Sequence, residues 1–312
     1  MRAILVTPGV RGNLRLGEID EPIADSDETL VRVQAVSVNR GEVKRAETAA
    51  QGSTIGWDLA GIVEAAARDG SGPQVGQRVV GFSPQMRAWA ELVAVDSAAL
   101  AIVPNAVSLA HAATLPVAGL TALYGLERAN RLLGAKVLVT GASGGVGYFA
   151  CQLARLMGAR VTAQVRRAEH VAMVQATGVE SVVVDSNGEG LADYAPFRLV
   201  LDGVAGPALG RLLEMLEGDG QAVLYGVSAG ASTALAVRQL MGTGAGRIDG
   251  FHLYRESEIV SAGSGLARLM HFVAGGELVP LIERTESWER VGDVAADLID
   301  RAYPGKAVLT ID

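Results

Sequence analysis

The sequence predicts an α/β protein in which a parallel sheet, covered by helices on both faces, is inserted into a smaller β-rich domain. Three observations support this fold class. Residues 1–105 contain short β-branched segments separated by turns, residues 136–253 alternate strand-like and helix-like segments, and a last strand-like segment covers 306–311. That last strand has no place in a parallel sheet of this kind, so we expect it to return to the first domain.

Length and composition indicate a well-buried globular protein of two domains. Of the 312 residues, 49% are hydrophobic and 20% are charged, which is the balance that disordered chains lack. The net charge is −7 and no run of Lys or Arg is present, so we expect no nucleic acid partner. No apolar run is long enough to span a bilayer, and the N-terminus turns polar too early for a signal peptide. We therefore expect no membrane association and a cytoplasmic location.

The expected strands of the first domain are bounded by Gly, Pro, Asp or Ser, and their regular spacing indicates a barrel or sandwich. An Ala- and Leu-rich helical segment, broken near Pro116, follows them, and two helices and a strand close the chain. These elements are Arg2–Val6, Thr29–Val38, Leu59–Ala66, Arg78–Phe82, Ala88–Val95, Ser108–Asn130, Ser257–Ala274, Ser287–Ala302 and Lys306–Ile311.

The inserted domain is expected to be a doubly wound sheet with right-handed crossovers, because its strands and helices alternate. The strands are Lys136–Thr140, Arg160–Gln164, Ser181–Val184, Phe197–Asp202, Gln221–Tyr225 and Arg247–Leu253. The helices are Gly144–Met157, Ala168–Thr177 and Pro207–Leu216.

A glycine-rich turn links the first strand and helix of this domain, and residues 137–148 read VLVTGASGGVGY. Small residues let the main chain approach a pyrophosphate, which the free N–H groups and the positive end of the helix dipole would bind. The alternative is a purely structural turn. Ala142 stands where the first glycine of G-x-G-x-x-G is common, which requires that its φ stay negative. The candidate cofactor-binding residues are Ala142, Ser143, Gly144, Gly145, Val146 and Gly147.

The second strand indicates which nicotinamide cofactor is bound. A NAD site needs a carboxylate at the end of this strand, but Val165 occupies that position and Arg166 and Arg167 follow. Guanidinium groups suit a ribose 2′-phosphate, so we predict NADPH. The alternative is that both arginines are solvated surface residues.

Several separated segments occur in the order seen in one family: 56–61 (GWDLAG), 75–79 (VGQRV), 112–122 (AATLPVAGLTA), 142–147 (ASGGVG) and 305–309 (GKAVL). In them the chain resembles the medium-chain dehydrogenases/reductases, and most of all their quinone oxidoreductase (zeta-crystallin-like) branch. The resemblance implies a Rossmann domain at 113–254, inserted into a GroES-like β-barrel catalytic domain made of 1–112 and 255–312. It also implies a cleft between the domains and a homodimer.

The resemblance also bears on zinc. The alcohol dehydrogenases of this superfamily carry Cys and His at catalytic-metal positions that here read Asn39 and Trp57, and the structural lobe of four cysteines is missing. The single cysteine, Cys151, lies in an apolar helical stretch and is expected to be a small buried residue. We therefore expect no metal site, and alcohol oxidation by a zinc Lewis acid is disfavoured.

Carried over position by position, the resemblance places Asn39 and Thr121 beside the nicotinamide or its ribose, and Tyr225 and Gly226 around the ribose. Phe251 resembles a segment that closes over the cofactor, and Lys306 resembles a lysine near the cleft. Each has a structural alternative: Asn39 and Thr121 could bond only to backbone, Tyr225 and Phe251 could belong to the core, and Lys306 could be a surface charge at a strand end.

Two carboxyl groups and one loop leave further alternatives open. Asp58 would suit proton transfer if buried, or it caps a turn or binds main-chain N–H groups. The resemblance places Glu42 facing the cleft, but we expect it to be solvated. Residues 43–55 read as a short loop without aromatic residues, which removes a Tyr that quinone reductases of this branch often carry there.

The expected activity is hydride transfer from NADPH to a small electrophilic acceptor, either a quinone or an α,β-unsaturated carbonyl. One alternative is an enoyl reductase that acts on a carrier- or CoA-linked acyl chain. Another is a non-catalytic protein that binds NADPH as a sensor or structural element.

Overall fold

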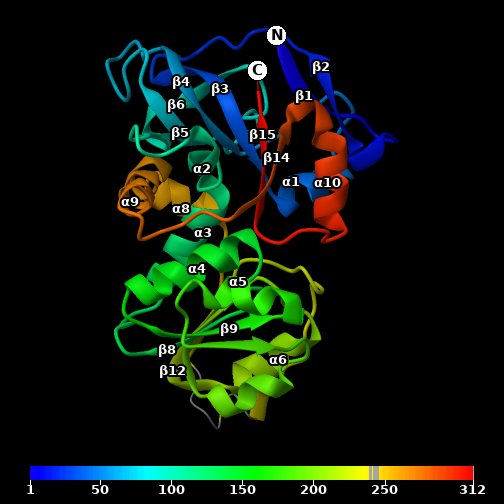
Figure 1. Ribbon diagram of the computed structural model, residues 1–312, viewed down its shortest axis with the longest axis vertical. Coiled ribbons are helices and arrows are strands. Elements are labelled where there is room, and N and C mark those ends of the chain that lie inside the picture. Colours follow the sequence, from blue (N-terminus) through cyan, green and yellow to red (C-terminus); the bar gives the residue numbers. More distant parts are fainter. Residues whose placement is uncertain (239–240, 242–245, 312) are drawn as a thin grey trace. The chain divides into compact units, whose positions relative to one another are not determined.

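The computed structural model describes residues 1–238, 241 and 246–311. The chain forms two compact units (Figure 1). One consists of Met1–Leu120 together with Ser257–Asp312, and the other is Thr121–Glu256. We refer to them as the discontinuous unit and the inserted unit. The junction at Leu120 falls inside helix α3 (Pro116–Glu127).

The inserted unit contains a six-stranded sheet whose order is β10-β9-β8-β11-β12-β13, and every neighbouring pair is parallel. In chain order the strands are β8 (Lys136–Val139), β9 (Arg160–Val165), β10 (Ser181–Val184), β11 (Phe197–Asp202), β12 (Leu216–Leu224) and β13 (Arg247–Gly250). The order reverses between β8 and β11, which makes their carboxyl ends the topological switch point of a Rossmann sheet.

Helices follow the strands as the alternating pattern predicts. They are α4 (Gly145–Leu156), α5 (Val171–Gln175) and α6 (Pro207–Glu214), with 3-10 turns η3 (Ala168–His170) and η4 (Glu189–Tyr194). Figure 1 shows α4 and α5 on one side of the sheet and α6 on the other. The middle strands are therefore buried on both faces: Leu199, Val200 and Leu201 of β11 are fully buried.

The discontinuous unit is built on a seven-stranded, mostly antiparallel sheet in the order β14-β15-β3-β4-β5-β7, with β6 also paired to β3. A separate hairpin joins β1 and β2. The strands are β1 (Arg2–Val6), β2 (Leu14–Glu18), β3 (Glu28–Val38), β4 (Asp58–Ala65), β5 (Arg78–Phe82), β6 (Leu92–Asp96), β7 (Leu100–Ile102), β14 (Ile282–Ser287) and β15 (Lys306–Thr310).

The closing strand β15 returns to the first domain as expected. It pairs with β3 on one side and with β14 on the other, and Ala307 and Leu309 join the core of the unit. The helical elements of this unit are η1 (Arg11–Asn13), α1 (Arg40–Ala46), η2 (Ser97–Ala99), α2 (Leu109–Ala113), α8 (Leu253–Ile259), which begins in the inserted unit, α9 (Ala262–Ala274), η5 (Trp288–Arg290) and α10 (Val291–Ile299).

Several expectations about elements are wrong, among them the strand 247–253, which ends at Gly250 because α8 begins at Leu253. Residues 43–55 are not all loop, because α1 runs to Ala46. The expected helix 257–274 is two helices, since Ser261 caps α9 by accepting the N–H of Ser264. Strands β2, β7 and β14 were missed: β2 and β7 are only five and three residues long, and the sequence of β14, IERTES, is polar. In the described residues, no helix combines the length and apolar character needed to cross a membrane.

Leu309 tests whether the C-terminal strand is an integral part of the discontinuous unit. The side chain is fully buried in the core, so Leu309→Ala should destabilise the protein by about 2–5 kcal/mol. Val75→Ala, at a side chain that is 65% exposed, is the control and should stay within about 0.5 kcal/mol of the parent. Urea unfolding followed by circular dichroism measures both, and equal stabilities would contradict the assignment.

Candidate active site

The glycine turn of the inserted unit joins β8 to α4 at the switch point. It is held by Gln164 of the neighbouring strand: the N–H of Gly141 donates to the Gln164 side-chain Oε1 (3.0 Å), and the N–H of Ala142 donates to the Gln164 carbonyl (3.0 Å). Gly141 takes the positive φ of 59° that the turn requires, and Ala142 is not among the described residues with positive φ. The condition for an alanine at position 142 is therefore met.

Gly147 and Gly144 serve different purposes in this turn. A Cβ on Gly147 would lie 2.5 Å from the Gly141 carbonyl oxygen, so only glycine lets α4 pack this closely against the turn. A Cβ on Gly144 would meet only the Gly141 oxygen at 3.4 Å, and Gly144 is exposed. The first turn of α4 leaves N–H groups without intrahelical partners. The turn is thus shaped to bring main-chain donors and the positive end of a helix to a ligand on its open side.

The other side of the switch point is built by the carboxyl ends of β11 and β12. Asp202 accepts hydrogen bonds from the Thr140 hydroxyl (2.5 Å) and the Ala205 N–H (2.7 Å), and its burial raises the pKa of its carboxyl. The Tyr225 ring packs on Gly203, where a Cβ would lie 2.5 Å from the ring. Gly226 passes equally close, with a Cβ position 2.7 Å from the Gly203 oxygen. Asp202 therefore fixes the loop that follows β11, and the Tyr225 ring packs against that loop.

The end of β9 carries the residues on which the choice of cofactor depends. Val165 is buried, and Arg166 and Arg167 are both exposed just beyond it. Arg167 forms an ion pair with Glu169 (3.2 Å), and both side chains are largely solvated. Two guanidinium groups are thus available beside the glycine turn, and no carboxylate occupies the strand end.

In the discontinuous unit, Lys306 is buried beneath Asn39. Only 4% of its side chain is exposed, so it is not a surface charge at a strand end. Its Nζ donates to the Asn39 Oδ1 (2.5 Å) and the Val38 carbonyl (3.3 Å), and lies 3.5 Å from the Asp58 Oδ2. An ammonium has three N–H donors, and these three acceptors use them all. Burial lowers the pKa of Lys306, and the charges of Asp58 and Glu42 oppose that shift.

Asp58 receives donors on both carboxylate oxygens and is fully buried. Besides Lys306, Oδ2 accepts from the Ser37 hydroxyl (2.5 Å) and the Asn39 Nδ2 (2.7 Å). Oδ1 accepts the N–H of Val117 (2.9 Å) in the first turn of α3, where a negative charge is stabilised by the helix dipole. Asp58 thus binds a main-chain N–H, which is one of the alternatives that the sequence left open. This bond fixes the first turn of α3, the helix that also contains Thr121.

Glu42 is not solvated, and that expectation is wrong. It is fully buried because its carboxylate accepts two main-chain N–H groups, from Asn39 to Oε2 (2.6 Å) and from Trp57 to Oε1 (2.7 Å). Burial and the nearby charge of Asp58 raise the pKa of Glu42 well above its usual value, although both hydrogen bonds act in the opposite direction. Glu42 is the third residue of α1 and Asn39 is its N-cap, a pairing that the sequence analysis missed and that the Asn-x-x-Glu spacing could have indicated.

The residues at this site do not fit a zinc ion. The two positions that correspond to Cys and His ligands carry an amide, Asn39, and an indole, Trp57, whose ring packs on Gly41. The cation that faces Asp58 is the ammonium of Lys306. Throughout the described part of the chain, no group of three or more His, Cys, Asp or Glu side chains could hold a metal ion. Asn39 and Trp57 thus offer neither the thiolate nor the imidazole that a catalytic zinc ion of this kind requires.

The remaining candidates lie on or near the helices. Thr121 is buried in α3, and Cys151 is buried in α4, where burial raises the pKa of its thiol to about 12. Phe251 is buried at the end of β13 beneath the Arg128 guanidinium, 5.9 Å from its ring. Arg128 also forms an ion pair with Glu256 of α8, so the same guanidinium contacts both the Phe251 ring and that helix.

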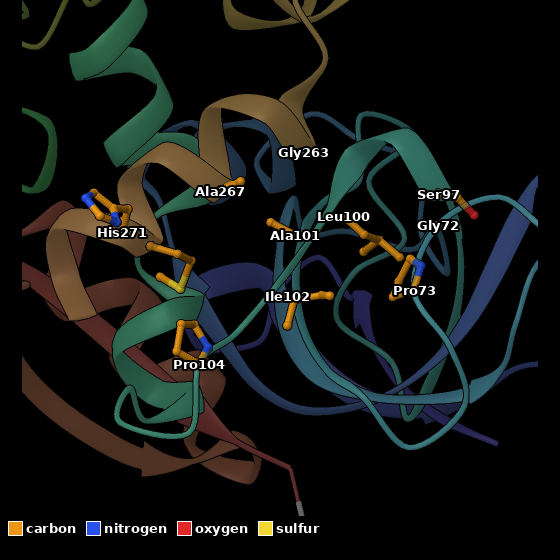
Figure 2. A pocket seen from close by; sticks show the side chains of 11 residues that line it. Gly72, Pro73, Ser97, Leu100, Ala101, Ile102, Pro104, Gly263, Ala267 and His271 are labelled. Carbon is orange, nitrogen blue, oxygen red and sulfur yellow. The ribbon is translucent and has the colours of Figure 1, made fainter. Parts of the chain in front are cut away.

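A separate cavity of about 520 Å³ lies in the discontinuous unit between β7 and α9 (Figure 2). Leu100, Ala101 and Ile102 line one side, and Gly263, Ala267 and His271 line the other. None of the residues that line it belongs to the candidate site.

Two family models match the chain and together cover more than half of it. The alcohol dehydrogenase GroES-like domain matches residues 25–105, and the zinc-binding dehydrogenase domain matches residues 145–266. With the strand orders above, these matches confirm the fold class: a Rossmann sheet inserted into a GroES-like domain. The chain belongs to the medium-chain dehydrogenase/reductase superfamily, in its quinone oxidoreductase-like branch.

The chain is similar to two kinds of protein, namely reductases of comparable length and segments of much longer polyketide synthases. It is 27% identical to 2-methylene-furan-3-one reductase of Solanum lycopersicum, over 92% of this chain and 73% of that protein. It is 34% identical to a mycocerosic acid synthase-like polyketide synthase of Mycobacterium tuberculosis, over 58% of this chain but only 9% of that much longer protein. A mycobacterial protein solved in complex with NADPH matches with a TM-score of 0.88 at 25% identity, over the full length of both chains.

The contrast between the two glycines yields a prediction about stability. Gly147→Ala should destabilise the protein by about 1–3 kcal/mol, because its Cβ would overlap the Gly141 carbonyl and the helix would have to shift. Gly144→Ala should leave stability within about 0.5 kcal/mol, since the site is open and φ is −86°. Thermal unfolding of the two variants measures this difference. A Gly147→Ala protein as stable as Gly144→Ala would contradict the close packing.

Proposed function

We propose that the protein is a zinc-independent reductase that uses NADPH to transfer a hydride to a quinone or an α,β-unsaturated carbonyl. The observation that carries the proposal is the glycine turn at the switch point, with its open side at Gly144 and two arginines at the end of β9. We also propose that the protein is a homodimer and that it is cytoplasmic. In the balanced reaction, NADPH, a proton and the acceptor give NADP⁺ and the reduced acceptor.

The chain's own residues would bind and orient the reactants. The turn 142–147 would hold the pyrophosphate, Arg166 and Arg167 the 2′-phosphate, and Tyr225, Gly226 and Phe251 the nicotinamide half. Asn39 and Thr121 would act at the reacting centre, where an oxygen of the acceptor gains negative charge and needs a hydrogen-bond donor. The described side chains include no exposed general acid at Asn39, so the proton would come from solvent.

The arginine pair tests the choice of cofactor. Arg166→Ala combined with Arg167→Ala should raise the Kd for NADPH by about 10–100-fold, because hydrogen bonds to a charged group are lost, while the Kd for NADH stays within about threefold. Arg160→Ala, at the opposite end of β9 and paired only with Glu180 at the surface, is the matched control. Isothermal titration calorimetry measures all three proteins. An equal loss for both cofactors would argue against 2′-phosphate recognition.

A panel of acceptors tests the reaction itself. Loss of NADPH absorbance should accompany the addition of free quinones or enones, and the Gly144→Ala protein should lose affinity for NADPH while staying folded. Binding of NADPH without consumption by any acceptor would instead support the sensor or structural alternative. Absence of binding to either cofactor would overturn the proposal.

A second candidate has specific support among the relatives. Several matched proteins are polyketide synthases, and another is acryloyl-coenzyme A reductase of Metallosphaera sedula, 29% identical over 74% of this chain. These similarities favour an enoyl reductase that acts on an acyl thioester. Turnover of enoyl-CoA or an enoyl thioester of pantetheine, compared with free quinones at equal concentration, separates the two substrate classes.

A further inference from the structure

We infer that Lys306 and Asp58 are positioning residues that fix the side-chain amide of Asn39 so that it presents an N–H, and not its carbonyl oxygen, to the acceptor. Hydride transfer does not by itself require a buried ammonium beside the carboxylate of Asp58, yet the fold maintains one there. The kinetic part of this inference rests on the proposed function.

The orientation of the Asn39 amide follows from its two neighbours. Lys306 has donors only, so the atom of Asn39 that faces it must be the carbonyl oxygen, Oδ1. Asp58 beside it accepts only, so the atom that faces it must be the nitrogen, Nδ2. A reversed amide would place N–H against the ammonium and oxygen against the carboxylate. Both contacts would then be repulsive, and a single orientation remains.

One N–H of this amide is left for a ligand. Nδ2 has two N–H bonds, and Asp58 accepts one of them; among the described residues the second has no acceptor. Asn39 is also the partly exposed member of a cluster whose other side chains, Ser37, Glu42, Asp58 and Lys306, are buried. The cluster therefore offers a single fixed donor toward solvent.

The ammonium also strengthens that donor. A hydrogen bond from a cation to an amide oxygen polarises the amide, which makes its N–H groups better donors, and the effect is larger in a buried site. Asp58 is held by two further bonds: its Oδ2 accepts the Ser37 hydroxyl and its Oδ1 accepts the Val117 N–H, so both carboxylate oxygens are fixed. A fixed donor of this kind suits the oxygen that becomes an enolate or hydroquinone anion.

A double-mutant cycle tests whether Lys306 acts through Asn39. Asn39→Ala should lower kcat by about 100-fold, the usual loss for one oxyanion donor, with the Kd for NADPH unchanged. Lys306→Met should lower kcat by about 10–100-fold, the loss that corresponds to one hydrogen bond to a charged group. The double variant should match Asn39→Ala within about twofold, because the two act as one unit. Lys44→Met, an exposed lysine of α1, is the control and should keep full activity. Losses that multiply would overturn the inference.

A spectroscopic measurement decides the same point without turnover. The side-chain amide of Asn39, assigned by its loss in Asn39→Asp, should show one proton protected from exchange by Asp58 and one in fast exchange. In Lys306→Met the proton bound to Asp58 should lose part of its protection, because one of the two contacts that fix the amide is gone while the bond to Asp58 remains; unchanged signals would overturn the inference. If Lys306→Met does not fold, Lys306→Gln replaces it, because glutamine keeps an N–H donor but carries no charge. In that variant the Asn39 amide should keep its orientation, and the chemical shifts of its protons should change because the polarising charge is lost. If the parent protein shows these signals but reduces no acceptor, the proposed function is overturned and the inferred orientation of the Asn39 amide stands.

Discussion

The discontinuous unit depends on a buried ammonium that satisfies groups from several elements at once. Lys306 comes from β15, Asn39 from the end of β3, and Asp58 from the start of β4. Through Asp58 the same cluster reaches the first turn of α3, and through the main chain of Asn39 it reaches Glu42 in α1. Buried charges are costly unless each is paired and hydrogen-bonded. Here the ammonium of Lys306 and the carboxylate of Asp58 each have hydrogen-bond partners on several elements, so these elements are held in one arrangement.

The inserted unit solves a different problem, because it must bring main-chain donors to a ligand instead of burying charge. Its requirements are steric: Gly147 lets α4 approach the Gly141 carbonyl, and Gly203 and Gly226 let the ends of β11 and β12 approach each other around Tyr225. The only buried carboxylate at the switch point, among the described residues, is Asp202, whose bonds go to Thr140 and the following loop. This edge of the sheet is therefore held by the close approach of main-chain segments at the glycines and by the hydrogen bonds of Asp202.

The two units therefore divide the chemistry that the proposed reaction needs. Cofactor recognition would draw on backbone N–H groups, a helix dipole and two exposed guanidinium groups, all of which a phosphate-bearing ligand can engage. Stabilisation of a developing oxyanion would draw on one amide held by charges that are hidden from solvent. The relatives of this chain include a 2-methylene-furan-3-one reductase, a quinone oxidoreductase-like protein and an acryloyl-coenzyme A reductase, so one fold carries reductases whose names give different acceptors.

The sequence by itself determined the local features: the alternating inserted unit, the strand–glycine–helix turn, the missing carboxylate at Val165 and the missing thiolate and imidazole at Asn39 and Trp57. Each of these depends on residues that are close in the chain, where periodicity and residue type carry the information. Tertiary structure decided the burial of Glu42 and Lys306 and their relation to Asp58, since the bond between Lys306 and Asn39 joins residues 267 positions apart. No local pattern distinguishes a lysine that will be exposed at a strand end from one that will be enclosed, because enclosure is set by the strands that come to lie on either side of it.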